Sequence, residues 1–349
     1  MKALVLSGGA SKGAFTAGVV RYLIRKKKME FDVAVGTSTG SLVAGPALLG
    51  DHAYCRDVYV SVNDKDIFQN SLIGKIATAI SHFVDFISGP IDARLDPLRK
   101  ILEDYYYGEE KLDQLLDSGK EMLVSVANVR TGKIQFVSSN QVKNGDIDED
   151  TFISAIVSSC SEPFFTKPVQ IFEKEENHPN CKDLFYDGGV KEFLPIEKAV
   201  SLGAEEIWAV STHPLEFQIT EWGGNTAAED VSFLKALAWT VGAFSDEVVR
   251  GDYYRAWTYF HWSKIIKLMK KEAPQLLNKP EVKDFLFGLS LPILHIIYPK
   301  DHLATSLQFE PATMWKYWLM GERRAKKMIE ENATEISDEN IKPWQLHQG

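Results

Sequence analysis

Three short segments of the sequence contain the residue types that an acyl-transfer reaction needs. "GTSTG" at 36–40 holds Ser38 between two glycines, "SGGASKG" at 7–13 is rich in glycine, and "DGG" at 187–189 begins with a carboxylate. A serine hydroxyl is a poor nucleophile until a base accepts its proton, and Asp187 is a candidate for that base. A glycine-rich loop offers backbone N–H groups to a developing oxyanion, with no side chains in the way.

Each segment also has an ordinary explanation when it is taken alone. Gly, Ser and Thr are common in strand-to-helix corners, Asp-Gly is a frequent turn dipeptide, and Lys12 is typical of a solvated helix residue. The glycine loop does not match the phosphate-binding pattern GxxxxGK[ST]. It fits the dinucleotide pattern GxGxxG only with Ala10 in place of the second glycine, and no acidic residue ends the following strand. The joint occurrence of the three segments therefore favours acyl transfer.

The first 50 residues predict the elements that position two of these segments. Apolar runs at 2–7 and 31–36 are typical of buried parallel strands, and helical spacing of apolar residues follows at 11–27 and 38–49. Strand, helix, strand, helix implies a right-handed crossover and a parallel sheet. The carboxyl ends of neighbouring parallel strands open onto one crevice, so the first two segments are expected to lie together. The sequence alone does not place Asp187 beside them.

The remaining sequence predicts one elaborated domain over residues 1–330, with a largely helical part at 229–330 and a polar tail at 331–349. A stretch at 66–87 has helical periodicity, and an aromatic-rich stretch runs from Trp239 to Trp262. Further expected elements are two strands around Thr131-Gly132 within 121–139, a short helix at 151–160, and strands at 183–189, 205–212 and 293–299.

The glycines around Ser38 permit a sharp strand-to-helix turn. Gly36 and Gly40 remove the side chains that would clash there, so the Ser38 hydroxyl is expected to project into the crevice. It would lie at the N-terminus of a helix, where the helix dipole and free N–H groups favour negative charge.

Composition excludes several other classes of protein. The formal net charge of −9 gives no general attraction to nucleic acid. Three cysteines without a CxxC pair indicate neither a disulfide framework nor a zinc site, and no metal or other cofactor is expected. No segment predicts a signal peptide, and the longest apolar stretch, 285–298, falls short of the roughly 20 residues of a spanning helix. We expect a cytoplasmic protein, compatible with peripheral membrane contact; the oligomeric state is not indicated.

Histidine offers an alternative to a serine–aspartate pair. The α/β-hydrolases use GxSxG with partners in the order Ser, acid, His, and four histidines follow Asp187. His213, which follows an expected strand, is the best of them; the others are His261, His295 and His302. However, Ser38 follows the second strand, whereas an α/β-hydrolase places several strands before its nucleophile. The triad therefore ranks second.

The three segments together resemble the patatin-like phospholipases, a family of serine lipid acyl hydrolases. The glycine loop of that family has the form D-G-G-G-x-R/K-G, and this chain matches it at Gly8, Gly9, Lys12 and Gly13. "GTSTG" matches its nucleophile turn and "DGG" its aspartate motif. Weaker similarity extends over 88–102, 155–165 and 309–329, so the resemblance covers most of residues 1–330.

The resemblance implies a calcium-independent three-layer α/β/α fold with a mainly parallel sheet and a Ser-Asp dyad without histidine. Ser38 would be the nucleophile and Asp187 the base, while backbone N–H groups of the loop would form the oxyanion hole. The loop residues are Gly8, Gly9 and Ala10, and the supporting residues are Lys12, Gly13, Gly36, Gly40 and Gly188.

Two positions of the glycine loop depart from the family pattern. Ser7 replaces the usual aspartate, and Ala10 replaces the third glycine. Alanine keeps the backbone N–H, so the donor survives. It carries a conformational cost only if that position needs a positive φ.

The expected reaction is hydrolysis of a fatty acyl ester, of the phospholipase A or lysophospholipase type, through an acyl-Ser38 intermediate. The stretch from Ile67 to Ile87 is a candidate wall or lid for an acyl channel, although for any single residue there an amphipathic core helix is the better explanation. The head group is not indicated. A catalytically silent lipid-binding module on the same fold is the non-enzymatic alternative, and the intact Ser38 and Asp187 argue against it.

Overall fold

The fold is built on one twisted, mainly parallel sheet. The computed structural model describes residues 1–61, 63–67, 95–163, 166–173, 178–215, 233–282, 292–303 and 309–334. Within these ranges seven strands pair in the order β4-β3-β2-β1-β6-β7, with β5 also paired to β3. The strands are β1 Lys2–Leu6, β2 Val33–Thr37, β3 Glu121–Asn128, β4 Ile134–Ser138, β5 Phe185–Asp187, β6 Glu206–Val210 and β7 Ile293–Ile297.

The order of the strands creates a switch point beside β1. From β1 the chain proceeds through β2 to β3 on one side, and later through β6 to β7 on the other, all in parallel. β4 and β5 are both antiparallel to β3. Open parallel sheets bind ligands in the crevice outside the carboxyl ends of their strands, at the point where the order reverses. Here that point lies between β1 and β6.

Alternate side chains of the central strand enter two different hydrophobic cores. Leu4 and Leu6 of β1 belong to a core that includes residues of α1, α2, α3, α7, α8, α10 and α14. Ala3 and Val5 point to the other face, where they pack in a core with residues of α11 and α12. Because successive strand residues face opposite ways, this apolar run needs cover on both sides. The protein is therefore a three-layer α/β/α structure, as the sequence predicts.

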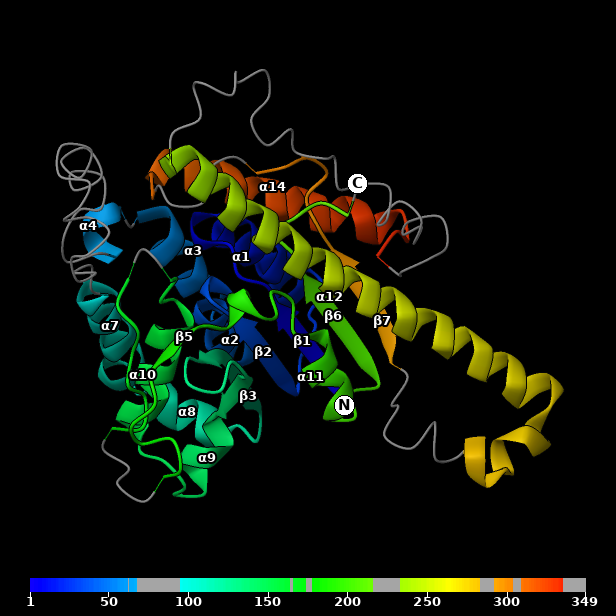
Figure 1. Ribbon diagram of the computed structural model, residues 1–349. Coiled ribbons are helices and arrows are strands. Elements are labelled where there is room, and N and C mark those ends of the chain that lie inside the picture. The colour runs from blue at the N-terminus through cyan, green and yellow to red at the C-terminus, as the bar shows by residue number, and fades with distance from the viewer. Residues whose placement is uncertain are drawn as a thin grey trace.

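The helices of the described residues vary widely in length, and Figure 1 shows α12 running diagonally across the molecule and extending past β7. Their bounds are η1 Ala10–Lys12, α1 Gly13–Arg21, η2 Tyr22–Lys26, α2 Thr39–Leu49, α3 His52–Ser61, α4 Asp64–Ile67, α7 Asp96–Glu103, η3 Asp104–Gly108, α8 Lys111–Asp117, α9 Ser139–Lys143, α10 Glu149–Ser159, η4 Gly188–Val190, α11 Ile196–Ser201, α12 Phe233–Glu272, η6 Pro274–Asn278 and α14 Pro311–Glu330.

The last helix packs closely against the first. A Cβ atom on Gly18 of α1 would lie 2.0 Å from the carbonyl oxygen of Trp318, and one on Gly321 of α14 would lie 2.1 Å from that of Phe15. Only residues without a side chain allow the two backbones to approach so closely. This contact brings α14, the segment at the end of the family resemblance, against the helix that follows the glycine loop.

The elements expected from hydrophobic periodicity are present where the structure describes them. The hairpin of β3 and β4 turns at Gly132, which has φ 63°, and the expected late strand is β7. The expected first helix begins differently, because the turn η1 precedes α1. Of the expected helix at 66–87, residues 68–87 lie outside the described residues.

The polar tail starts as an attached segment. Thr334 is buried, its carbonyl accepts a 2.8 Å hydrogen bond from the Ile296 N–H of β7, and its side chain lies 3.0 Å from His295 Nδ1. Residues 335–349 lie outside the described residues. The domain bounds 1–330 stay a prediction.

Candidate active site

Ser38 occupies a strained corner between β2 and α2. Its backbone has φ 54° and ψ −130°, a conformation that residues with side chains rarely adopt. Such strain costs on the order of 1–3 kcal/mol and persists only when the surroundings hold it. The glycines make the corner possible: a Cβ atom on Gly36 would lie 2.6 Å from Ser41 Cα, and one on Gly40 would lie 2.3 Å from the Leu6 carbonyl oxygen. The sharp turn expected from the spacing is present.

Hydrogen bonds to both sides of the Ser38 backbone hold this conformation. The Ser38 N–H donates to Ser159 Oγ at 2.9 Å. The Ser38 carbonyl oxygen accepts from the Ser41 N–H at 2.8 Å and from Ser41 Oγ at 2.6 Å. Sequence reasoning assigned no role to Ser41 or Ser159. The available signal was the run "SSCS" at 158–161, which directly follows the apolar residues Ala155 to Val157 at the end of the helix.

The pairing of β3 places Asp187 directly beyond the end of β2. Thr37, the last residue of β2, pairs with Ser125, and Asp187 pairs with the next residue, Val126. β4 occupies the opposite edge of β3 over 123–127. The short strand β5 therefore continues along the edge of β3 where β2 ends, and it brings Asp187 to the Ser38 corner.

Burial perturbs the Asp187 carboxyl strongly. It is 6% exposed, and burial raises its pKa from 3.8 to about 7. Hydrogen bonds from the Ser38 side chain and the Gly189 N–H lower this pKa in part, while nearby Glu162 raises it. The Gly189 N–H lies 2.7 Å from Oδ1. A carboxyl with a pKa near neutrality can both accept and return a proton at physiological pH.

Close packing explains the glycine that follows the aspartate. A Cβ atom on Gly188 would lie 2.4 Å from Ser125 Oγ, and that hydroxyl is hydrogen-bonded to Thr37 Oγ1 at 2.7 Å. The carbonyl oxygen of Ser161, after α10, accepts the Asp187 N–H at 2.9 Å. Residues at the end of β2, within β3 and just after α10 thus hold the segment around Asp187 in place.

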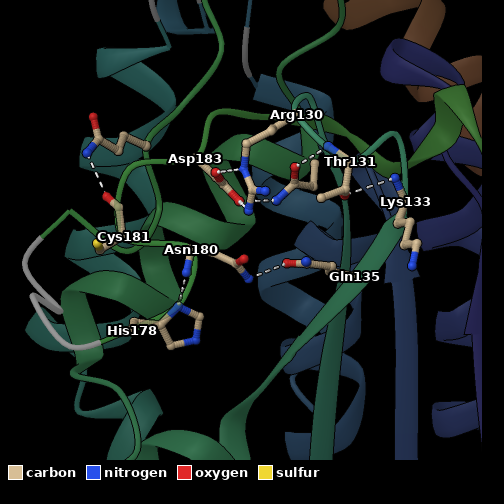
Figure 2. Close-up of polar contacts among 10 residues, drawn as sticks. Arg130, Thr131, Lys133, Gln135, His178, Asn180, Cys181 and Asp183 are labelled. Atoms are coloured by element: carbon tan, nitrogen blue, oxygen red, sulfur yellow. Dashed lines mark hydrogen bonds and ion pairs between the residues drawn. The ribbon is translucent and has the colours of Figure 1, made fainter.

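A polar cluster anchors the chain just before β5, and Figure 2 shows it around Asp183. The Asp183 carboxylate accepts from Asn128 Nδ2 at 2.7 Å and from Arg130 Nε and Nη2 at 2.5 and 2.8 Å. Asn180 Nδ2 donates to Gln135 Oε1 at 3.1 Å. These contacts tie the segment that leads to Asp187 to the β3–β4 hairpin.

The glycine loop after β1 presents two unused backbone donors. Gly9 has φ 145° and Ala10 has φ 46°. The Gly8 N–H donates to the Phe193 carbonyl oxygen at 3.4 Å, whereas no acceptor for the N–H of Gly9 or Ala10 is found among the described residues. Of the three expected oxyanion donors, Gly9 and Ala10 are therefore available, and alanine occupies a position that disfavours a side chain.

Ser7, which stands where the family has aspartate, attaches the loop to the end of β6. Its Oγ accepts the Thr212 N–H at 3.1 Å and donates to the Gly8 carbonyl oxygen at 3.0 Å. Thr212 Oγ1 also donates to that carbonyl oxygen at 2.8 Å. A Cβ atom on Gly9 would lie 2.6 Å from the same Oγ1, so the loop passes tightly over Thr212.

The loop and the nucleophile corner are in contact. A Cβ atom on Gly8 would lie 3.0 Å from Ser38 Cβ, and one on Gly13 would lie 2.8 Å from Thr39 Oγ1. The Lys12 N–H closes the η1 turn by donating to the Gly9 carbonyl oxygen at 2.9 Å. Burial lowers the pKa of the Lys12 ammonium, and the negative charges of Asp246 and Glu162 oppose that shift.

His213 lies near the loop but makes no hydrogen bond to the serine or the aspartate. Its ring packs edge-on against Phe193 at 4.7 Å, and among the described residues its Nδ1 has no hydrogen-bond partner. Burial lowers its pKa to about 3, and the charges of Lys12 and His302 act in the same direction. His213 is therefore a neutral, half-buried imidazole at physiological pH.

Two further histidines lie in contacts of their own. The His295 ring stacks on Trp208 of the neighbouring strand, with ring centroids 4.1 Å apart. The His261 ring lies against Trp257 on α12 at 4.0 Å. Neither of these two contacts involves Ser38 or Asp187.

An apolar cavity of about 50 Å³ opens beside Ser38. Its lining residues come from the glycine loop, α2, α3, α4, α7 and the segment after α10, and most of them are hydrophobic. They are Ala10, Ser38, Thr39, Leu42, Val58, Tyr59, Ile67, Leu95, Leu98, Cys160, Glu162, Thr166 and Phe309. Ile67 lines this cavity and also belongs to the hydrophobic core, so both explanations of the 67–87 stretch apply to it, and residues 68–87 lie outside the described residues.

Comparison with known proteins identifies the family. The model of the patatin-like phospholipase family matches residues 4–200, which include all three segments. The chain belongs to this family. The matched range covers more than half of the 349 residues. The name of the family describes its members as phospholipases.

Individual relatives are more distant. The uncharacterized protein YjjU of Escherichia coli strain K12 is 22% identical over 225 residues, which cover 63% of this chain and 54% of that protein. This chain therefore matches only about half of the length of that relative. The solved structure of VipD from Legionella pneumophila matches with a TM-score of 0.42 and 13% identity, covering 95% of this chain and 67% of that one.

Among the described residues, no helix is both long enough and apolar enough to cross a membrane. Over the same ranges, no group of three or more His, Cys, Asp or Glu side chains is arranged to hold a metal ion.

Proposed function

We propose that this protein hydrolyses fatty acyl esters of lipids through an acyl-Ser38 intermediate, with Asp187 as the base. The observation that carries the proposal is the meeting of three features at one edge of the sheet. They are the strained Ser38 corner, the buried Asp187 carboxyl with its pKa near 7, and two N–H groups of the adjacent loop that have no acceptor among the described residues. This is the set of groups that acyl transfer needs.

In the first half of the reaction, the Asp187 carboxylate accepts the Ser38 proton as Oγ attacks the carbonyl carbon of the ester. The C–O bond to Ser38 forms while the carbonyl oxygen becomes an oxyanion, which the N–H groups of Gly9 and Ala10 bind. The tetrahedral intermediate then breaks its bond to the alcohol oxygen. Protonated Asp187 gives its proton to that oxygen, and the alcohol leaves.

In the second half, a water molecule takes the place of the alcohol. Asp187 accepts a proton from the water as its oxygen attacks the acyl carbon, and the bond to Ser38 Oγ breaks. The proton returns to Ser38, and the fatty acid is released. One carboxyl group with a pKa near neutrality serves both directions, because it is ionised in each attack and protonated in each collapse.

The apolar cavity beside Ser38 supports an acyl substrate and also indicates a requirement. Its hydrophobic lining suits a hydrocarbon chain, but about 50 Å³ is little more than the volume of one or two water molecules. The walls must separate before a long chain enters. Short esters are therefore the right substrates for a first activity assay. Peripheral contact with a lipid surface and a cytoplasmic location stay predictions.

The triad alternative requires His213 to reach Ser38. Its Nδ1 lacks a partner among the described residues and its pKa is lowered to about 3, so the folded site strongly disfavours its protonation. A catalytic imidazole must carry a proton during each cycle. These properties favour the dyad.

Covalent labelling tests the proposal. The wild-type chain is incubated with a fluorophosphonate, and the mass increase is located by peptide mass spectrometry, while hydrolysis of p-nitrophenyl butyrate is followed by absorbance. We expect labelling at Ser38 and turnover, both lost in Ser38→Ala. A wild-type protein that neither labels nor turns over any ester would support the silent lipid-binding module instead.

Substitution of the two candidate bases separates dyad from triad. Asp187→Asn removes the base but keeps a similar shape, and we expect a loss of at least about a thousandfold in kcat, in the range typical of a lost catalytic base. His213→Ala is the matched variant. We expect its kcat to fall less than about tenfold, because the His213 ring contributes only packing. Full activity in Asp187→Asn would refute the dyad, and a thousandfold loss in His213→Ala would establish the triad.

A further inference from the structure

The peptide groups of Gly8 in the glycine loop are held from two sides, by segments that follow two different strands. The Gly8 N–H donates to the Phe193 carbonyl oxygen at 3.4 Å, on the segment after β5. The Gly8 carbonyl oxygen accepts from Thr212 Oγ1 at 2.8 Å, on the segment after β6. Gly9 and Ala10, whose N–H groups are the expected oxyanion donors, follow directly in the chain. The position of these donors therefore depends on how the two segments are held.

Asp252 of α12 holds the first of these segments. Its Oδ2 accepts the Phe193 N–H at 2.8 Å and the Leu194 N–H at 2.7 Å. Arg255, one turn further along α12, pairs with Oδ1. Asp252 is 2% exposed, and a buried carboxylate is costly unless such partners compensate it. Its two backbone partners both belong to the segment that supplies the acceptor for the Gly8 N–H.

Tyr253, the next residue of α12, holds the second segment. Its hydroxyl oxygen lies 2.6 Å from Ser211 Oγ and 2.7 Å from the His213 carbonyl oxygen, within hydrogen-bond distance of both. These two residues flank Thr212, whose side chain donates to the Gly8 carbonyl oxygen. Tyr253 is 1% exposed and packs in the core that β1 shares with α11 and α12. Two consecutive residues of one helix thus anchor both partners of Gly8.

One helix reaches both segments, because consecutive helix residues point about 100° apart around the axis. This helix, α12, crosses the molecule in Figure 1 and lies beyond the family match, which ends at residue 200. The two segments also touch each other, since the rings of Phe193 and His213 pack edge-on with centroids 4.7 Å apart. A Cβ atom on Gly8 would lie 3.2 Å from Phe193 Cε2, so this ring limits where the glycine loop can lie.

We propose that Asp252 and Tyr253 are positioning residues of the acyl-transfer site. Together they clamp both peptide groups of Gly8, and the clamp aims the N–H groups of Gly9 and Ala10 at the oxyanion. Neither residue of the pair lines the apolar cavity beside the nucleophile, so the pair acts through the loop. Oxyanion donors are effective when they are preorganised, because they then need no reorganisation during the reaction. This inference rests on the proposed ester hydrolysis and adds two residues to its machinery.

Tyr253→Phe tests the clamp by removing one hydroxyl while keeping the ring. We expect kcat for p-nitrophenyl butyrate to fall about tenfold while KM changes less than about twofold, because the oxyanion forms only in the transition state. Tyr105→Phe is the matched control, since Tyr105 is also 1% exposed and its hydroxyl has no hydrogen-bond partner among the described residues. Its kcat should stay within about twofold of wild type.

A thiono ester separates positioning of the donors from a general loss of structure. In this analogue of the substrate, sulfur replaces the carbonyl oxygen, and sulfur is a weak hydrogen-bond acceptor. We expect the ratio of kcat for the oxygen ester to kcat for the thiono ester to fall about tenfold in Tyr253→Phe and in Asp252→Ala. Asp252→Asn keeps an oxygen that can accept both N–H groups and should restore most of this ratio. Equal losses with both esters would show that the pair contributes only structure.

Hydrogen exchange tests the clamp without any need for activity. Backbone exchange of residues 7–13 is followed by mass spectrometry in wild type, Tyr253→Phe and Tyr105→Phe. We expect it to be about tenfold faster in Tyr253→Phe alone, with exchange at 36–41 unchanged, because local opening governs exchange. A loosened loop in a chain that hydrolyses no ester supports the clamp and refutes the proposed hydrolysis. Ester hydrolysis with kcat and loop exchange unchanged in Tyr253→Phe refutes the clamp alone.

Discussion

The corners after β1 and β2 are built from the same kinds of residues but use their backbones in opposite ways. At the β2 corner, both backbone groups of Ser38 are bonded, to Ser159 and Ser41. At the β1 corner, the N–H groups of Gly9 and Ala10 have no acceptor among the described residues. Both corners contain a residue with a side chain at positive φ, Ser38 at 54° and Ala10 at 46°.

The difference teaches how adjacent corners divide one chemical task. A nucleophile has to be held by its backbone so that only its side chain reacts, and strain at Ser38 is compensated by the hydrogen bonds around it. A donor loop has to leave its N–H groups free for the oxyanion, so its attachment comes from other atoms, at Ser7 and Gly8. Loss of these specific contacts should therefore have different consequences at the two corners.

The largest expected effect is at Gly40. A Cβ atom there meets the carbonyl oxygen of Leu6, a backbone atom in the middle of the sheet, at 2.3 Å. We expect Gly40→Ala to cost about 3 kcal/mol or more and to lower Tm by at least about 6 °C, with loss of soluble protein. Gly108→Ala is the control, because nothing lies within 4 Å of a Cβ atom there. Equal thermal stability of the two variants would mean that β1 can move away.

The pH dependence of activity should report the titration of Asp187 beside the Ser38 corner, because the backbone N–H groups of the glycine loop do not titrate. Because the base must be ionised, kcat/KM is expected to rise with pH with an apparent pKa of about 7, so that it falls about fiftyfold from pH 7 to pH 5. Glu192, whose pKa burial also raises to about 7, provides the control. Glu192→Gln should leave the position of the inflection in place, and an inflection near pH 4 in wild type would contradict a buried base.

The free energy of unfolding should fall as pH rises, whereas the activity should increase. The Asp187 pKa is raised, so between about pH 4 and 7 the folded chain binds more protons than the unfolded one, and its free energy of unfolding falls as pH rises. Asp187→Asn removes this dependence. By thermal melts, we expect the Tm of Asp187→Asn minus that of wild type to grow from pH 5 to 8; a constant difference would refute the shift.

A smaller effect is expected at Ser159. Ser159→Ala leaves the Ser38 N–H without its acceptor, which costs about 1–3 kcal/mol and should lower kcat by roughly ten- to hundredfold if the corner relaxes. The adjacent Ser158 is an unusually close control, since it is equally buried and its Oγ has no hydrogen-bond partner among the described residues. Ser158→Ala should change kcat by less than about twofold. Equal losses in the two variants would show that Ser159 contributes only packing.

The smallest effect is expected at Ala10. Ala10→Gly relieves about 1–2 kcal/mol of left-handed strain and adds about 0.4–1 kcal/mol of unfolded-state entropy cost. We therefore expect Tm to rise by about 1–3 °C. Ala44→Gly, in the middle of α2, is the opposite control and should lower Tm, because glycine is unfavourable inside helices. A lower Tm for Ala10→Gly would mean that the loop holds alanine without strain.

Local pattern was enough to predict the two corners and the fold class. The apolar runs of β1 and β2, each followed by glycines and a helical repeat, specify strand-turn-helix units within about 20 residues. The position of Asp187 required more, because β5 has three residues and its pairing partner Val126 lies 61 positions earlier (187 − 126). A strand of three residues is too short for its periodicity to predict which strand it pairs with, or at which edge.

The sequence by itself determined the chemical types: a serine between glycines, an aspartate before glycines, and a loop with little side chain. These are local properties, since the conformational freedom and the chemistry of a residue depend on its own type. Only the tertiary structure decided which hydroxyl accepts the Ser38 N–H. It also decided that the Phe193 carbonyl oxygen accepts the Gly8 N–H, while the N–H groups of Gly9 and Ala10 have no acceptor among the described residues. The pKa of Asp187 was decided there too, because burial is a property of the surrounding chain, which the folded sheet brings together.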